Sequence, residues 1–266
     1  MLKKRLIPCI LVRDNLLVQS INFSKYLPIG KPKIAIEYFN RWDVDEIVVL
    51  DITPNKKDHE NLIHLTEHIS KIAFVPLTVG GGVKSTEDIN KLLKAGADKV
   101  SINTNAVLNP EFITKASKVF GSQDIVISID VKTDIDNNYE VYIFGGREKT
   151  GIDPFTWSKK IEKLGAGEIL LNSIDRDGMK NGYDIQLIRS VVDSVNIPVI
   201  AIGGVGKISD IPLGITEGNA DAVAAANIFQ YLEHSTIQAK AAMKNAGINV
   251  RIGTKANYAQ KLLHTL

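Results

Sequence analysis

Short apolar runs rich in valine, isoleucine and leucine alternate with amphipathic stretches along the whole chain. Eight runs predict β-strands, at 5–12, 46–51, 75–79, 98–102, 125–130, 168–172, 198–202 and 221–225. Helical patterns follow near 33–41, 59–72, 86–95, 110–118, 154–164, 184–194, 208–217 and 234–245. Near-continuous apolar strands that alternate with helices are typical of a parallel sheet covered by helices. Eight βα units predict a (β/α)8 TIM barrel, and a doubly wound open sheet is the alternative.

The two halves of the sequence repeat each other. Residues 7–12 (IPCILV) align with 126–131 (VISIDV), and residues 78–83 (TVGGGV) align with 201–206 (AIGGVG). The repeat favours the closed barrel and predicts one domain built from half-barrels at about 1–122 and 123–250, followed by a tail at 251–266. In this register Asp130 aligns with Leu11, so only one half carries an acid at this position.

Two connections are longer than a βα loop requires. Segment 13–30 has a length typical of a lid or of a disordered loop. Segment 132–150 contains DIDNN before YEVYIF, which predicts a small hairpin after the fifth strand. Both insertions would project from the C-terminal face of the barrel, where such barrels carry their active sites.

The composition is that of an ordinary globular protein. It is 44% hydrophobic with a formal net charge of +2, which gives no argument for binding nucleic acid or membranes. A single cysteine, Cys9, excludes an internal disulfide and fits a reducing compartment. Because no apolar run approaches about 18 residues and no signal peptide is recognisable, we expect a soluble, cytoplasmic protein.

Glycine pairs follow the third and seventh predicted strands, at equivalent points of the repeat. Glycines there let backbone N–H groups approach an anion, and the next helix adds its positive N-terminus. Tight turns also use glycine pairs, but their presence in both halves favours phosphate binding. The implied substrate is a small molecule with an anionic group at each end. The predicted phosphate-binding residues are Gly81, Gly82, Asn103, Thr104, Asp177, Gly178, Gly203, Gly204, Ala226 and Asn227.

Carboxylates at the ends of predicted strands are the candidate acid–base groups. Asp130 ends an apolar strand, so we favour a catalytic role for it over a helix cap or a solvated rim charge. For Asp51, at the end of the second strand, a catalytic role and a purely structural or solvated role are equally well supported.

Charged residues also begin four of the strands: Arg5, Glu46, Lys99 and Glu168. Barrel interiors are normally apolar, so these residues either point outward or pair inward as a neutral ring. Spacing alone favours the outward reading. The HxxEH pattern of His64, Glu67 and His68, with His59 nearby, falls on an outer helix, so we interpret it as a solvent-facing surface and expect no metal.

Taken together, KKRLIPC, TVGGGV, GADKVSINT, GAGEILLNSIDRDG and IGGVGK resemble the HisF family, the cyclase subunit of imidazole glycerol phosphate synthase. The resemblance covers nearly the whole chain. It implies a barrel that forms a heterodimer with a HisH-like glutaminase docked on its bottom face. The ammonia it receives would split and cyclise a doubly phosphorylated ribulosyl intermediate, with no cofactor, to imidazole glycerol phosphate and an aminoimidazole carboxamide ribotide.

The resemblance also assigns residues at the bottom of the barrel. It implies that Arg5, Glu46, Lys99 and Glu168 form the salt-bridge gate at the ammonia entrance, which favours the inward ring. It implies that Asp98 faces the glutaminase.

The catalytic rim departs from the family pattern. The family's two essential acids correspond to Asp130 and to Leu11, and leucine has no proton to exchange. Further differences from the family's lysine, threonines and serines are Gln19, Asn172, Met179, Ile202 and Asn227.

These differences leave three hypotheses. The first is a diverged paralogue that supplies ammonia, with a sugar amidotransferase, to convert an N-acetyl sugar to an acetamidino sugar in lipopolysaccharide biosynthesis. The second is an authentic cyclase of histidine biosynthesis with its acid moved to Asp14 or Asp51. The third is a non-catalytic scaffold that activates a glutaminase, against which the phosphate loops argue. The retained gate and lost acid favour the first.

Overall fold

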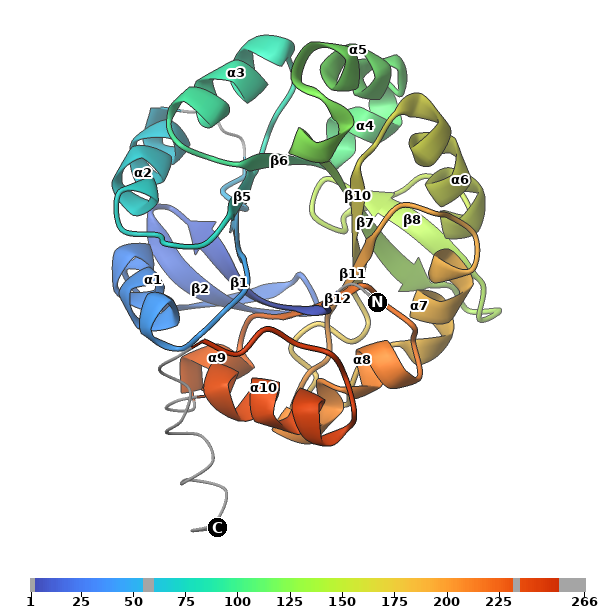
Figure 1. The fold of residues 1–266 in the computed structure, drawn as a ribbon. Helices are drawn as coiled ribbons and strands as arrows, with labels where there is room; N and C mark the ends of the chain where they lie inside the picture. Colours follow the sequence, from blue (N-terminus) through green and yellow to red (C-terminus); the bar gives the residue numbers. More distant parts are fainter. Residues whose placement is uncertain (1–2, 55–59, 232–234, 254–266) are drawn as a thin grey trace, which may run out of the picture.

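The computed structural model describes residues 3–54, 60–231 and 235–253. Eight parallel strands form a closed barrel, in which β12 pairs with β1 and β10 pairs with β7 (Figure 1). In order around the barrel they are β1 (Arg5–Arg13), β4 (Ile47–Asp51), β5 (Leu77–Gly80), β6 (Lys99–Ile102), β7 (Ile125–Thr133), β10 (Glu168–Ser173), β11 (Val199–Ile202) and β12 (Ala222–Ala225). The predicted TIM barrel is confirmed, and the open-sheet alternative is wrong.

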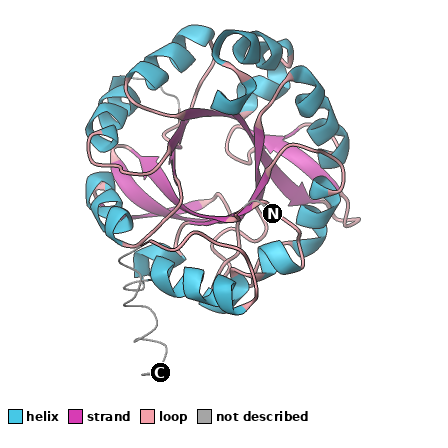
Figure 2. Ribbon diagram, in the orientation of Figure 1, coloured by secondary structure: helices cyan, strands magenta, loops and turns pink. Residues whose placement is uncertain are grey.

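Helices surround the barrel on its outside (Figure 2). They are α1 (Pro32–Arg41), α2 (Glu60–Ser70), α3 (Thr86–Lys94), α4 (Thr104–Leu108), α5 (Glu111–Phe120), α6 (Pro154–Leu164), α7 (Ile185–Val192), α8 (Leu213–Thr216), α9 (Ile228–Tyr231) and α10 (Ser235–Asn245), with 3-10 turns η1 (Ser122–Asp124) and η2 (Ile208–Asp210). The single helix predicted at 208–217 is instead η2 followed by α8. Pro212, which caps α8, has no N–H to donate to a preceding turn. In the part of the chain that the structure describes, no helix is long and apolar enough to cross a membrane.

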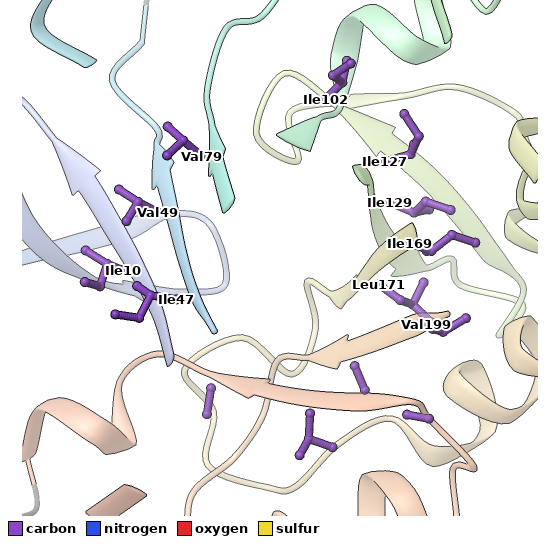
Figure 3. Close-up of a cluster of buried hydrophobic side chains, with 14 of the residues drawn as sticks. Ile10, Ile47, Val49, Val79, Ile102, Ile127, Ile129, Ile169, Leu171 and Val199 are labelled. Carbon is purple, nitrogen blue, oxygen red and sulfur yellow. The ribbon is translucent and has the colours of Figure 1, made fainter. Parts of the chain in front are cut away.

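Alternation along the strands separates two apolar layers. Along β1, Leu6 and Ile10 pack outward against the helices, whereas Ile7, Cys9 and Leu11 point into the barrel. Figure 3 shows part of the outer layer, including Ile10. Burial raises the pKa of the Cys9 thiol to about 12, so this cysteine is a packing residue rather than a nucleophile.

The first insertion is an ordered hairpin, so the disordered-loop alternative at 13–30 is wrong, while a role as a lid stays a prediction. Strands β2 (Leu16–Ile21) and β3 (Lys25–Gly30) pair antiparallel with each other, and β2 pairs with β1. Asp14 and Asn15 both have positive φ (51° and 64°), as a two-residue hairpin turn requires.

The second insertion confirms the predicted hairpin. Strand β8 (Tyr139–Ile143) pairs antiparallel with β7, and β9 (Glu148–Lys149) pairs with β8. The two hairpins therefore follow repeat-related strands, β1 and β7, and lie on opposite sides of the barrel (Figure 1). The half-barrel boundaries themselves stay a prediction, and most of the proposed tail lies outside the described residues.

Candidate active site

A cavity of about 1400 Å³ opens at the C-terminal ends of the barrel strands. All ten predicted phosphate-binding residues line it, together with Asp130 and Asp51. The structure thus brings these residues together around one cavity, while their binding of phosphate stays a prediction.

Glycine is required sterically in both cradles. Gly81 has φ +128°, and a Cβ there would lie 2.2 Å from the backbone oxygen of Asp51. Gly204 has φ +101°, and its Cβ would lie 2.1 Å from the backbone oxygen of Gly182. Both positions bring backbone close to backbone at the edge of the cavity, so neither tolerates a side chain.

Asp130 lies at the inner end of this cavity, 7% exposed. Burial raises the pKa of its carboxyl to about 7, and the nearby Asp177 charge adds to the rise. A hydrogen bond from Asn103 Nδ2 to Asp130 Oδ2 (2.9 Å) opposes it. A carboxyl with a pKa near neutrality can both accept and donate a proton under physiological conditions.

Asp177 ties the first hairpin to the cavity. Its Oδ2 accepts hydrogen bonds from the Ser20 hydroxyl (2.5 Å) and the Phe23 N–H (3.3 Å). Its backbone oxygen accepts from the Asn22 N–H (2.9 Å). Burial raises the pKa of Asp177, while the hydrogen bonds that its carboxylate accepts from Ser20 and Phe23 lower it. Sequence reasoning missed Ser20 and Phe23, because nothing local indicates that they reach a loop more than 150 residues away.

Leu11 stands where the repeat would place a second acid. It lines the cavity, is 9% exposed, and packs with Val18 of the hairpin in the inner apolar cluster. A leucine at this position extends the apolar barrel interior up to the cavity.

The other departures from the family pattern divide into two groups. Asn172, Ile202 and Asn227 also line the cavity. Gln19 is buried in the hairpin and Met179 is exposed, and neither is a lining residue. Of the two positions considered for a moved acid, Asp51 lines the cavity and accepts from the Thr53 N–H (2.9 Å), whereas Asp14 is not among the lining residues.

The four charges at the opposite end form an inward ring. Arg5 bonds Glu46 (Nη1–Oε2 2.8 Å) and Glu168, and Lys99 bonds the same two acids (Nζ–Oε2 3.0 Å and 2.8 Å). Glu46 also accepts from the Thr78 hydroxyl (2.6 Å). The outward reading favoured by spacing alone is therefore wrong, because the four charges satisfy each other across the barrel axis. Their role as a gate stays a prediction.

Asp98 is exposed beside this ring, and its Oδ2 accepts from the Leu77 N–H (2.8 Å). Its repeat equivalent, Asp221, accepts in the same way from the Val199 N–H (3.2 Å). The carboxylate thus has a structural role, and contact with a partner stays a prediction.

On α2, His64 and Glu67 lie 3.5 Å apart (Nδ1–Oε2), with largely exposed side chains. His59 lies outside the described residues.

Comparison of the sequence with known proteins identifies its family. The sequence model of the family described as "Histidine biosynthesis protein" matches residues 5–235. The chain is 52% identical over 258 residues to a Vibrio vulnificus (strain YJ016) protein named as imidazole glycerol phosphate synthase subunit hisF2, covering 97% of this chain and 94% of that protein. It is 45% identical over 251 residues to the imidazole glycerol phosphate synthase subunit HisF of Alkaliphilus metalliredigens (strain QYMF), covering 94% and 100%. The chain therefore belongs to the histidine biosynthesis protein family, among the HisF-type synthase subunits.

Proposed function

We propose that this HisF-type subunit receives ammonia from a glutaminase docked at the ring and supplies it for amidation of an N-acetyl nucleotide sugar in surface-polysaccharide biosynthesis. One observation carries the proposal: the ring is complete at the bottom of the barrel, while the acid position opposite Asp130 is a buried leucine at the top. The charged ring expected at the ammonia entrance is present, whereas the second of the two acids expected for cyclisation is absent.

The barrel interior suits the passage of a small neutral molecule. Between the ring and the cavity most inward side chains are apolar, although Thr78, Ser101 and Ser128 also point inward. The apolar ones include Ile7, Val48, Val126, Leu170, Ile200 and Ala222. Neutral ammonia loses little by leaving water compared with ammonium, whose charge would be expensive to bury. The ring combines two positive and two negative charges, so it presents no net charge to the incoming molecule.

The top of the barrel offers a single well-placed proton acceptor. When the nitrogen of ammonia bonds to the acetyl carbon, that carbon loses its oxygen as water, and Asp130 can move a proton from the nitrogen to the departing oxygen. Leu11 cannot supply a second proton transfer, and loss of an acid–base group commonly costs about two to four orders of magnitude in rate. Cyclisation by the family's two-acid chemistry is therefore disfavoured.

A cyclase of histidine biosynthesis is the second candidate, and one observation favours it. Asp177 lies close enough to Asp130 to raise its pKa, so two carboxylates still share the cavity. The Alkaliphilus HisF protein also aligns over its whole length. A non-catalytic scaffold is disfavoured, because it would not need so large a cavity with two glycine cradles.

Turnover decides between the first two candidates. The purified chain is incubated with ammonium salt and the phosphoribulosyl substrate, and imidazole glycerol phosphate is measured. We expect none above the level of Asp130→Asn, and turnover near that of an ordinary cyclase would overturn the proposal. Leu11→Asp should give little rescue, because Asn172, Ile202 and Asn227 remain around the cavity.

Coupling to a glutaminase is tested separately. With a co-expressed glutaminase, Lys99→Met should lower the rate at which amidated sugar forms from glutamine. The rate with added ammonium salt should stay unchanged. Lys115→Gln, at an exposed site on the outer helix α5, is the matched control. Equal glutamine dependence in the two variants would contradict the proposed gate.

A further inference from the structure

Two cationic side chains line the cavity from strands on opposite sides of the barrel. Arg13 and Lys132 lie two residues beyond Leu11 and Asp130 on the inward side of β1 and β7, and both line the cavity. The repeat relates them in the same register as Leu11 and Asp130. Because β1 and β7 are separated by three strands in the eight-stranded barrel, the two cations project from opposite walls.

Each cation is held over a tyrosine of its own hairpin. The Arg13 Cζ lies 4.8 Å from the ring centroid of Tyr26, and the Lys132 Nζ lies 5.9 Å from that of Tyr142. An aromatic face positions a cation without neutralising its charge. The same arrangement in both halves indicates a built feature rather than two unrelated surface residues.

Neither cation lies in a buried ion pair among the described residues, although acids lie near both tyrosines: the charges of Asp177 and Asp130 act on Tyr26, and those of Glu140, Asp175 and Asp134 act on Tyr142. Arg13 lies 3.8 Å from Asp14 (Nε–Oδ2), whose side chain is 71% exposed, so solvent screens this contact strongly. Lys132 makes no ion pair with any residue that the structure describes. Asp130 and Asp177 lie deeper, each engaged by its own hydrogen-bond donors.

Arg147 adds a third positive charge from the second hairpin. It lines the cavity, and its Nε donates to the Phe144 oxygen (2.7 Å), which leaves its two terminal nitrogens available. The connections at the far ends of the two hairpins meet at this point, since a Cβ on Gly146 would lie 3.0 Å from Phe23 Cδ2. Burial and the charges of Asp177 and Asp130 raise the pKa of the Tyr26 hydroxyl, and the charges of Arg13 and Arg147 oppose that rise.

The glycine cradles lie on the other two walls. Going around the barrel from β1, the first cradle follows β5 and β6, Lys132 follows on β7, and the second cradle follows β11 and β12. The line joining the cradles therefore crosses the line joining Arg13 to Lys132 near the centre of the mouth. A substrate with a phosphate at each end would place charge at the cradles and none at this crossing.

We propose that Arg13, Lys132 and Arg147 form a third anion site, which takes the diphosphate of a nucleoside diphosphate sugar. A diphosphate presents oxygens to both sides, so opposed cations can bind it together, and an arginine can do so through paired N–H donors. The nucleoside and the sugar then extend toward opposite cradles. This assignment rests on the proposed function and names the class of its substrate.

The test is calorimetric titration of the full chain with UDP-N-acetylglucosamine, with inorganic pyrophosphate and with fructose 1,6-bisphosphate, whose phosphates lie at its two ends. Arg13→Gln and Lys132→Gln should each weaken binding of the first two probes at least tenfold, and Lys115→Gln should not. The affinity for fructose 1,6-bisphosphate should change less than threefold in either cavity variant.

Three outcomes would overturn the assignment. They are no binding of either diphosphate, equal affinity in the variants and the control, or equal affinity for pyrophosphate and the nucleotide sugar, which would indicate a simple anion site. Thermal melts of the variants check folding. The titration contains no glutamine and no glutaminase, so failure of ammonia transfer would not affect it.

Discussion

Asn103 Nδ2 donates a hydrogen bond to Asp130 Oδ2 at 2.9 Å, joining the end of β6 to the end of β7 inside the cavity. This contact stabilises the ionised carboxylate and works against the burial that raises its pKa to about 7. The protonation of Asp130, the predicted catalytic acid, thus depends on the side-chain amide of Asn103, which the sequence analysis predicted to bind phosphate.

Replacing that amide should change the titration of Asp130. Asn103→Leu removes a hydrogen bond to a charged group, of the order of 1.5–3 kcal/mol, so the pKa of Asp130 should rise by about one unit or more. Carboxyl carbon NMR shifts followed against pH measure it. Asn105→Leu, at a neighbouring amide that donates instead to the Lys84 oxygen, is the control. An equal shift in both variants would assign the effect to the general environment.

Asp130→Asn should stabilise the fold at alkaline pH. In the unfolded chain this carboxyl ionises near pH 4, whereas in the folded chain it ionises near pH 7. Between these values the folded state binds more protons, so this group makes stability fall as pH rises through that window. The variant should gain on the order of 2–4 kcal/mol at pH 8 and almost nothing at pH 4. Urea unfolding at both pH values measures the gain, and a loss at pH 8 would show that ionised Asp130 stabilises the fold.

The ring should contribute more to stability than a peripheral ion pair does. Arg5→Met leaves the nearly buried Glu46 and Glu168 with one cation instead of two, so we expect a loss of about 3 kcal/mol in the free energy of unfolding. Lys4→Met breaks only the pair with Asp221, whose side chain is 44% exposed, and should cost less than about 1 kcal/mol. Similar urea midpoints for the two variants would contradict the prediction that the ring contributes more to stability than the peripheral ion pair.

The cradle glycines should differ sharply from other glycines at the mouth. Gly81→Ala places a methyl group 2.2 Å from the Asp51 backbone oxygen and should cost roughly 3–5 kcal/mol. Gly145→Ala also lies in the left-handed region, at φ +67°, but meets no atom within 4 Å, so about 1–2 kcal/mol is expected. Thermal unfolding of the two variants compares them, and equal losses would assign the whole cost to backbone conformation.

The fold could be predicted because barrel strands are buried on both faces. Such strands appear as continuous apolar runs, and β10, predicted at 168–172, is found at Glu168–Ser173. The first hairpin was missed although its signal was present. Asp14 and Asn15 tolerate positive φ, and LLVQSI follows them, but length alone suggested a loop.

The site was only partly predictable, for a different reason. Glycines and polar residues at strand ends locate the cavity, because parallel strands bring their carboxyl ends to one face. The direction of the Glu46 side chain depends on strand stagger, which spacing does not give. The contact of Ser20 with Asp177 depends on the closed barrel, so it has no signature in either segment.

The two hairpins also affect how the barrel can fold. The barrel closes only when β1 pairs with β12, whose residues follow more than 200 positions later, and such distant pairing carries a high loop-closure cost. The antiparallel pairs of β1 with β2 and of β7 with β8 need only the next few residues of chain. Each half of the repeat therefore contains one β unit that can form locally, and we expect both hairpins to acquire amide protection before the barrel closes.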